Sequence, residues 1–392
     1  MRNIREFLVK LFDLFCGTGG FSMGFANSTY GNFQVAFGID LLESSVSTFK
    51  LNHRKAASLA NDIRKVRRSE VARLTKIKKG SLDILVGGPP CQGFSSIRPF
   101  RSSNEDDPRN SLFEEYASFV NYFRPKIFIL ENVVGLATHK GGRTLETMEE
   151  CFLSLGYETD WKLLNAAHFG VPQKRERFIL IGVERGGVIA FPEPTHQFKG
   201  ATIGFKDKSR LLDPGTMKKS SEKRLPNAIS AMEAIGDLPP IASGEEARSY
   251  SSDPFTEFQK DRRKMSSNLK LHTATKHSSK MLEIIRHSGK NIDCIPKHLI
   301  TSGFSSCYSR LAADEPAVTI TVNFVHPASN RCIHPKLDRA LTPREGARLQ
   351  SFDDDFEFAG SRTQITKQIG NAVPPLLGQA VADAIAKSNV LV

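Results

Sequence analysis

The stretch that decides the fold is LFDLFCGTGGF, residues 11–21, in which an apolar run leads into a glycine-rich turn. This pattern predicts a buried strand over residues 11–15 that turns directly into a helix, because glycine permits tight backbone turns. Backbone amides in such a turn, together with the N-terminus of the following helix, favour an anionic ligand. A tight turn without a ligand uses the same residues, so the motif alone is a weak signal.

Apolar runs alternate with helical patterns through the first half of the chain, which is typical of a mainly parallel sheet. We predict further strands at residues 35–39, 82–86, 127–130, 157–164 and 178–183, and a helix at 145–155. Later in the chain we expect a strand at 318–322 and a final helix with apolar residues from Leu376 to Ile385. The predicted fold class is α/β.

The 392-residue chain is long enough for one large domain and a smaller one. Its 54 Lys and Arg against 42 Asp and Glu leave a net charge of +12, which favours a polyanionic partner. The six cysteines lack zinc-ligand spacing, so we expect reduced thiols and no metal site. Because no stretch is apolar enough to span a membrane and no signal-peptide core is present, we expect a cytoplasmic protein without a membrane partner.

Two segments are strongly polar. Residues 199–290 are rich in serine and lysine, and disorder is one interpretation, but scattered aromatics such as Tyr250 and Phe255 favour an irregular folded module. A basic cluster runs from Arg64 to Lys79 with a spacing that predicts the positive face of a surface helix. That face is either simply solvated or a nucleic-acid contact, and the sequence leaves both open.

A cysteine stands at a second strand end, in GGPPCQGFS at residues 87–95. The two prolines fix φ and remove amide donors, which stiffens the backbone before Cys91. Ligands of open α/β sheets bind outside the carboxyl ends of the strands, where this cysteine is expected. An isolated cysteine is more often an inert buried side chain than a nucleophile, so other residues are needed to distinguish these two interpretations.

The residues near the glycine turn indicate a nucleoside cofactor. Asp40 ends the second predicted strand, 20 residues beyond Gly20, where an acid can bind ribose hydroxyls. Phe15 beside the turn suits a cationic sulfonium through cation–π attraction. No lysine follows the glycines, which excludes a triphosphate-binding loop. The cofactor that fits is S-adenosylmethionine.

Charged residues adjoin two other predicted strands, one after its end and two before its start. Glu131 ends the strand at 127–130 and points into the same crevice, or it caps the next helix. Arg175 and Arg177 alternate in an extended segment, which places them on one face.

Taken in order, these motifs resemble those of the cytosine-5 DNA methyltransferases, and the resemblance covers about residues 9–186 and 315–390. The motifs that carry it are Asp13-x-Phe15-x-Gly17-x-Gly19-Gly20, Pro89-Pro90-Cys91-Gln92, Glu131-Asn132-Val133, Gln173-x-Arg175-x-Arg177 and Gly370-Asn371-x-Val373-Pro374. Residues 339–345, RALTPRE, resemble the scaffold motif of that family. Any single motif is modest, but five in the family order are highly specific.

The resemblance implies a Rossmann-like S-adenosylmethionine-dependent methyltransferase sheet with a smaller, irregular target-recognition domain. The implied divisions are residues 1–190 for catalysis and cofactor binding, 191–330 for target recognition, and 331–392 for a segment that completes the catalytic domain. The implied activity is transfer of a methyl group to carbon 5 of a cytosine flipped out of a specific duplex DNA sequence.

By the same resemblance, Cys91 adds to carbon 6 of the cytosine, Glu131 binds its N3 and exocyclic amine, and Arg175 and Arg177 supply positive charge beside the base. The implied cofactor contacts are Phe15, Thr18 and Gly20 for the methionine part, Asp40 and Leu41 for ribose and adenine, Asp62 and Ile63 for the adenine edge, and Leu112 and Asn371 closing the pocket. Leu41 stands where some relatives have a larger stacking side chain.

The resemblance further implies that residues 93–110 form a loop that closes over DNA. We expect residues 301–306 to lie nearest the flipped base. The expected partner is double-stranded DNA, bound by a monomer of bacterial or phage type that is nucleoid-associated and that has, in a restriction-modification pair, a cognate endonuclease. The alternatives are a tRNA cytosine-5 methyltransferase, whose Cys-Phe-Thr signature is missing here, and a catalytically silent DNA-binding relative. A dehydrogenase would leave the Pro-Pro-Cys-Gln motif unexplained.

Overall fold

A computed structural model of the chain describes residues 7–90, 111–198, 205, 207–212, 214, 225–264, 266, 268–300, 303, 305–388 and 390–391. Cys91, the predicted loop at 93–110, and residues 301, 302 and 304 of the predicted base-proximal loop lie outside this description. The strands are β1 (Val9–Leu14), β2 (Phe33–Asp40), β3 (Ala57–Ala60), β4 (Ile84–Gly87), β5 (Ile127–Asn132), β6 (Tyr157–Asn165), β7 (Gln173–Lys174), β8 (Glu176–Glu184), β9 (Leu211–Leu212) and β10 (Ala317–Val318). The α-helices are α1 (Gly20–Ala26), α2 (Glu43–Asn52), α3 (Arg68–Thr75), α4 (Ser111–Phe123), α5 (Gly135–Thr138), α6 (Arg143–Ser154), α7 (Ala231–Ile235), α8 (Glu257–Arg263), α9 (Ser279–Arg286), α10 (Pro343–Leu349), α11 (Arg362–Asn371) and α12 (Pro375–Lys387).

The predicted α/β sheet is confirmed. Eight strands pair in the order β3-β2-β1-β4-β5-β8-β6-β9, and the pairs from β3 to β5 are all parallel. Strand β8 runs antiparallel to both β5 and β6. The carboxyl ends of β1, β2, β4 and β5 therefore meet at one edge, where ligands of such sheets bind.

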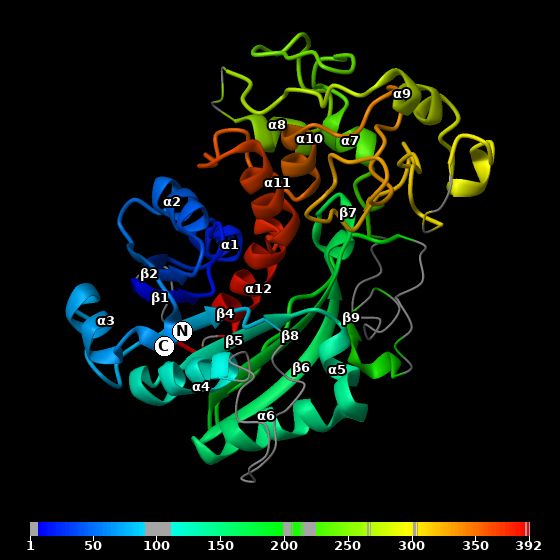
Figure 1. Ribbon diagram of the computed structural model, residues 1–392. Helices are drawn as coiled ribbons and strands as arrows, with labels where there is room; N and C mark the ends of the chain where they lie inside the picture. The colour runs from blue at the N-terminus through cyan, green and yellow to red at the C-terminus, as the bar shows by residue number, and fades with distance from the viewer. Residues whose placement is uncertain are drawn as a thin grey trace.

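Alternating side chains of the strands supply two apolar cores, one on each face of the sheet. On one face Phe12, Leu14 and Phe128 pack with α3, α4 and α6. On the other face Leu11 and Ile129 pack with α1, α2 and α12. Figure 1 shows α4 and α6 below the sheet, with α1 and α12 above it. The period-2 alternation of strand side chains explains why both faces are covered.

Two glycines bring the first and last helices of the sheet into backbone contact. A Cβ on Gly24 would lie 2.3 Å from the Pro375 carbonyl oxygen, and one on Gly378 would lie 2.5 Å from the Phe21 carbonyl oxygen. Only residues without a side chain permit this approach of α1 and α12. The C-terminal helix thus completes the core beside the glycine-rich turn.

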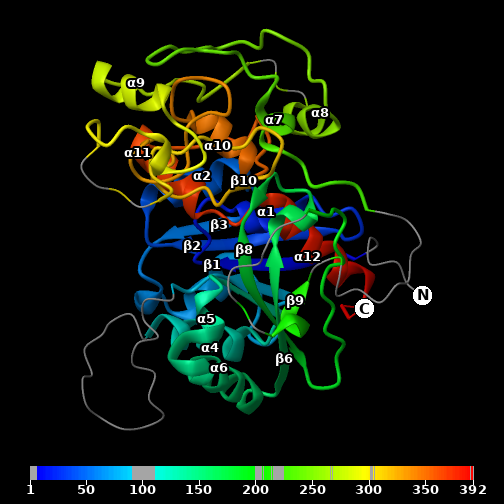
Figure 2. The same cartoon turned by 90° about the vertical axis from the view of Figure 1, so that its right-hand side faces the viewer.

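A third apolar core lies above the sheet, around α7, α10 and α11 (Figure 2). It includes Ile235 and Phe258 from the middle segment, together with Leu349 and Ile369 from the last part of the chain. The described part of the middle segment is irregular and folded, since short helices are joined by long coil stretches. The division at residue 330 stays a prediction, although this core joins residues on both sides of it.

Buried ion pairs hold this third core together. We call Arg339, Arg344, Glu345, Arg348 and Asp354 the scaffold cluster, and each of them is at most 1% exposed. The Glu345 carboxylate accepts two hydrogen bonds from Arg339, at 2.8 and 2.7 Å, and Asp354 accepts two from Arg348, both at 2.6 Å. Burial would raise the pKa of Glu345, but the positive charge of Arg339 lowers it overall.

Two predicted elements differ from the structure. The predicted strand at 318–322 is reduced to β10, because side chains form hydrogen bonds with both backbone polar groups of Ile320. The Ile320 N–H donates to Gln173 Oε1 at 2.8 Å, and the Ile320 carbonyl accepts from Arg175 at 3.1 Å. In the basic cluster only residues 68–75 form an α-helix, since Lys76 ends it with φ of 57°. No helix in the described ranges is long and apolar enough to cross a membrane.

Candidate active site

A cavity of about 1080 Å³ opens at the carboxyl ends of the parallel strands. Every predicted site residue in the described part of the chain lines it: Phe15, Thr18, Gly20, Asp40, Leu41, Asp62, Ile63, Leu112, Glu131, Arg175, Arg177 and Asn371. Pro89 and Pro90, which directly precede the predicted nucleophile, line it too. The structure thus gathers residues from both ends of the chain around one cavity, while their individual roles stay predictions.

The glycine-rich turn after β1 forms one wall. Phe15, Gly17 and Gly19 have positive φ values of 57°, 50° and 80°, so the backbone turns sharply at the strand end. A Cβ on Gly19 would lie 2.6 Å from a ring nitrogen of His53, and one on Gly20 would lie 2.6 Å from the Val373 carbonyl oxygen. Glycine is required here both for the turn and for its packing against the segment before α12.

Asp40 at the end of β2 stabilises this turn by accepting backbone hydrogen bonds. Its Oδ2 accepts a hydrogen bond from the Gly17 N–H and its Oδ1 one from the Leu42 N–H, both at 2.9 Å. Burial raises the pKa of Asp40, and these backbone bonds oppose the rise. Each carboxylate oxygen keeps a further lone pair, so Asp40 is able to accept from a ligand hydroxyl as well.

Two buried polar atoms in the wall have no hydrogen-bond partner among the described residues, Asp13 Oδ2 and Thr18 Oγ1. Asp13 is 3% exposed, and burial, with the charges of Asp40 and Glu131, raises its pKa to about 7. An unpaired buried acceptor of this kind costs about 1–3 kcal/mol unless a ligand satisfies it. The cavity therefore favours a ligand that carries a positive charge or donor near Asp13.

Glu131 and Arg177 form an ion pair at the end of β5. The distance from Arg177 Nε to Glu131 Oε1 is 2.6 Å, and the two side chains are 11% exposed for Arg177 and 13% for Glu131. A Cβ on Gly88 would lie 2.8 Å from Glu131 Oε2, so the glycine before the two prolines makes room for this carboxylate. The pair thus sits immediately beside the strand end that leads to Cys91.

Arg175 has a different environment from Arg177. It is 2% exposed, and its two terminal nitrogens donate to the carbonyl oxygens of Ile320, at 3.1 Å, and Gly370, at 3.0 Å. Burial, followed by the charge of Arg177, lowers the pKa of Arg175. Its Nε has no partner among the described residues. Arg175 thus connects the segments of Ile320 and Gly370 to the cavity wall.

Several residues of this wall are not predicted from the sequence. Asn132 donates from Nδ2 to the Pro89 carbonyl at 2.8 Å and thereby holds the Pro-Pro segment against β5. Its place directly after Glu131 in the same motif is the signal that points to such a role. Gln364, Lys367 and Gln368 of α11 also line the cavity, and nothing in their sequence pattern indicates it.

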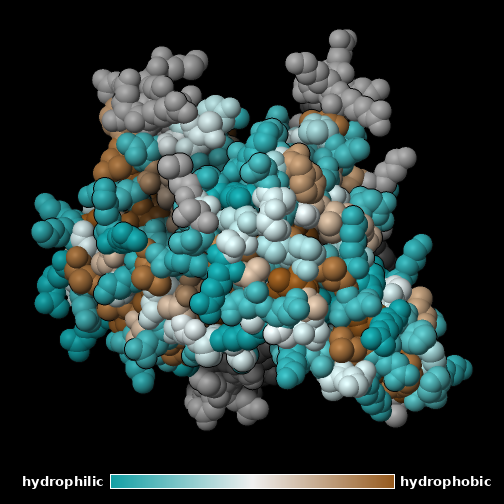
Figure 3. Space-filling model, turned by 90° about the horizontal axis from the view of Figure 1, so that it is seen from above, coloured by the Kyte–Doolittle hydropathy of each residue, from teal (hydrophilic) through white to brown (hydrophobic). Residues whose placement is uncertain are grey.

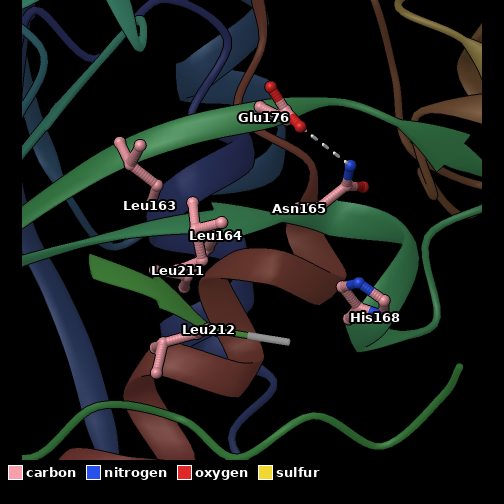
Figure 4. A pocket seen from close by; sticks show the side chains of 7 residues that line it. All are labelled: Leu163, Leu164, Asn165, His168, Glu176, Leu211 and Leu212. Atoms are coloured by element: carbon pink, nitrogen blue, oxygen red, sulfur yellow. Dashed lines mark hydrogen bonds between the residues drawn. The ribbon is translucent and has the colours of Figure 1, made fainter. Parts of the chain in front are cut away.

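A second, much smaller cavity of about 10 Å³ lies between β6, β8 and β9 (Figure 4). Its lining residues are Leu163, Leu164, Asn165, His168, Glu176, Leu211 and Leu212. Asn165 donates to Glu176 at 3.5 Å across it. The volume admits about one water molecule, so this cavity is not a substrate site.

The family model of the C-5 cytosine-specific DNA methylases matches residues 9–387. The chain belongs to this family. A Type II methyltransferase, M1.HphI of Haemophilus parahaemolyticus, is 35% identical over 381 residues, covering 96% of this chain and 86% of the relative. M.DdeI of Desulfomicrobium norvegicum is 34% identical over 407 residues, covering 96% and 88%. The predicted resemblance is confirmed, and the protein is a DNA (cytosine-5)-methyltransferase of restriction-modification type.

Solved structures confirm the fold of this methyltransferase. A DNA modification methyltransferase encoded within an E. coli prophage superposes with a TM-score of 0.71 at 23% identity, covering 97% of this chain and 99% of the other. A Spodoptera frugiperda DNMT2 variant superposes with a TM-score of 0.59 at 14% identity, covering 98% and 99%. At these identities the likeness concerns the fold alone.

Proposed function

We propose that this methyltransferase transfers the methyl group of S-adenosylmethionine to carbon 5 of a cytosine flipped out of a specific duplex sequence, through a covalent adduct with Cys91. The observation that carries the proposal is the single cavity in which the Glu131–Arg177 ion pair and the Pro-Pro strand end face the glycine-rich turn. A stacked base cannot enter such a cavity, because its reacting edge is covered by its neighbours, so the base has to leave the helix.

The residues present fit S-adenosylmethionine. Asp40 offers lone pairs at the end of β2, and the unpaired Asp13 Oδ2 faces the part of the cavity beside the glycine turn. Leu41, which is 69% exposed, and Ile63 both line the cavity and offer apolar surface to an adenine ring. When bound, the cofactor supplies an electrophilic methyl group on a positively charged sulfur.

The reaction follows from the side chains of this chain. The Cys91 thiolate adds to carbon 6 of cytosine, which would turn the ring into an enamine whose carbon 5 accepts the methyl group as the bond from that methyl to the cofactor sulfur breaks. Glu131 binds the N3 edge of the ring and stabilises its protonated form during this addition. Arg177 keeps Glu131 in place through the 2.6 Å ion pair. Loss of the proton on carbon 5 and breaking of the carbon 6–sulfur bond then release 5-methylcytosine and the Cys91 thiolate.

Duplex DNA with 5-fluorocytosine at the target position tests this chemistry. Fluorine cannot leave as a proton, so we expect a stable protein–DNA adduct that mass spectrometry maps to the peptide containing Cys91. Cys91→Ser should prevent the adduct, whereas Cys151→Ser, at a half-buried cysteine on α6, should leave it unchanged. An adduct at another cysteine, or methylation of tRNA in preference to duplex DNA, would overturn the proposal.

Residues 191–330 are our proposed target-recognition segment. Its described part forms a folded body over the sheet, and the surface seen from above is mainly hydrophilic, with apolar residues in small separate patches (Figure 3). Polar side chains are what contacts to phosphates and base edges require. Exchange of residues 191–330 with those of a relative of different specificity should transfer the methylated sequence; a folded chimera that keeps the recipient's sequence would contradict this.

A further inference from the structure

A strongly basic surface starts at Arg64 of the cavity lining and extends away from the cavity, in the connection from β3 to β4. Residues 64–79 contain eight Lys and Arg against one acid, so they hold seven of the chain's twelve net positive charges. We call the seven exposed ones the basic strip: Arg64, Lys65, Arg67, Arg73, Lys76, Lys78 and Lys79. This concentration is unlike the ordinary helices of the molecule. Helix α6, for example, carries Arg143 with three glutamates.

Most charges of the strip are unneutralised. Among the residues that the structure describes, the ion pairs here are those of Arg64 with Asp62 and of Arg68 with Glu115. Arg68 turns inward and lies 4.8 Å over the ring of Phe119, so it belongs to the packing of α3 on α4. Within the described ranges, the other cations of the strip form no ion pair with a carboxylate. Like charges this close repel one another, so an external polyanion is the partner that relieves the repulsion.

The position of the strip indicates which polyanion. Arg64 lines the active-site cavity, and the strip continues from it over η2 (Ile63–Lys65) and α3. Apolar anchors beneath the strip, Ile63, Val66 and Val71, are buried in the core, so the charges sit on a fixed support. Because the strip starts at a residue of the cavity lining, the duplex that flanks a base held in the cavity is the polyanion we assign to it, and duplex DNA carries about one negative charge per 1.7 Å of axis.

We propose that the basic strip binds phosphates of the duplex that flanks the target, outside the cavity and independently of sequence. Such contacts supply affinity and attract DNA over distance, but they carry no base information. The strip therefore raises the affinity for long DNA without changing the methylated sequence or the chemical step. This inference builds on the DNA methyltransferase activity and does not depend on the covalent mechanism.

The test compares two triple variants of equal charge. Lys65→Gln, Arg73→Gln and Lys78→Gln remove three charges of the strip, none of which belongs to an ion pair in the part of the chain that the structure describes. Lys50→Gln, Arg143→Gln and Arg185→Gln remove three exposed charges elsewhere. Binding of a long duplex and of a short duplex limited to the target is measured as a function of salt, together with single-turnover methylation of the saturated short duplex.

For the strip variant we expect roughly tenfold weaker binding of the long duplex, and a salt slope that is shallower by about 0.9 for each phosphate that the variant no longer neutralises. Binding and single-turnover methylation of the short duplex should remain those of the unchanged protein. Equal weakening in both triple variants, or an unchanged long-duplex slope, would overturn the proposal. Cys91→Ser separates the two proposals, since it should stop methylation and leave the salt slope intact.

Discussion

The cavity wall and the scaffold cluster both bury charged groups, and they do so in opposite ways. In the scaffold cluster Glu345 and Asp354 each accept two hydrogen bonds from an arginine. In the cavity wall Asp13 Oδ2 and Thr18 Oγ1 have no partner among the described residues. Because an unpaired buried polar atom is costly, it persists where a ligand satisfies it. The scaffold cluster thus holds its buried charges in ion pairs, whereas the cavity wall also keeps two buried polar atoms that a ligand is able to satisfy.

Glu131 in the cavity wall and Glu345 in the scaffold cluster are both ion-paired with an arginine, so comparing them separates a role in the reaction from a role in packing. Glu131→Gln should lower the methylation rate by about 10²–10⁴-fold, because the glutamate acts on the base in the reaction. The thermal unfolding midpoint should change little, since the side chain keeps its shape at the cavity. Single-turnover kinetics and calorimetry measure the two effects; a variant that unfolds but stays active at low temperature would contradict the assignment.

The scaffold cluster should respond in the opposite way. Arg348→Met removes the buried cation shared by Asp237 and Asp354 and leaves Asp354 only the longer 3.4 Å pair with Arg344, which should lower the free energy of unfolding by about 3–5 kcal/mol. Arg143→Met, on the exposed surface, is the matched control and should change it by less than about 0.5 kcal/mol. Denaturant titration gives both values. Equal stability of the two variants would show that the cluster contributes nothing to the fold.

Asp13 should make the ligand-free protein sensitive to pH. Burial raises its pKa to about 7, so the folded state keeps a proton that the unfolded chain has lost. Stability should therefore fall as pH rises from about 4 to about 7, by at most about 4 kcal/mol, and stay level above that. Asp13→Asn should remove this dependence. Unfolding at about pH 5.5 and about pH 8 without cofactor measures it, on either side of the folded-state pKa. An identical pH profile in the variant would refute the role of this carboxyl.

Asp40 should show the smallest of these effects. Asp40→Ala removes the acceptor proposed for the ribose hydroxyls, and S-adenosylmethionine should bind about 10- to 100-fold more weakly, which corresponds to about 1.4–2.8 kcal/mol. DNA binding should change less. Asp62→Ala, at a half-buried carboxylate already paired with Arg64, is the milder comparison. Unchanged cofactor affinity in calorimetric titration of Asp40→Ala would exclude the ribose role.

The sequence predicts the elements whose signal is local. The strands expected at 11–15, 35–39 and 127–130 agree with β1, β2 and β5 to within about two residues at most ends, because each is a short apolar run bounded by turn residues. The strand at 318–322 is overpredicted for the same reason: its apolar alternation is real, but the side chains of Gln173 and Arg175 bind the backbone of Ile320. Partners so remote along the chain leave no trace in a local pattern.

The amino-acid sequence by itself determined the α/β class, the family and the set of residues at the strand ends, since glycine turns, Pro-Pro-Cys-Gln and the apolar periods act over a few neighbours. Only the tertiary structure decided which partners those residues bind. Arg175 and Arg177 stand close together in the chain, yet one binds carbonyls of distant segments and the other pairs with Glu131. That division depends on which backbone and which charge the fold brings within hydrogen-bond distance, and such contacts are set by packing between segments remote in sequence.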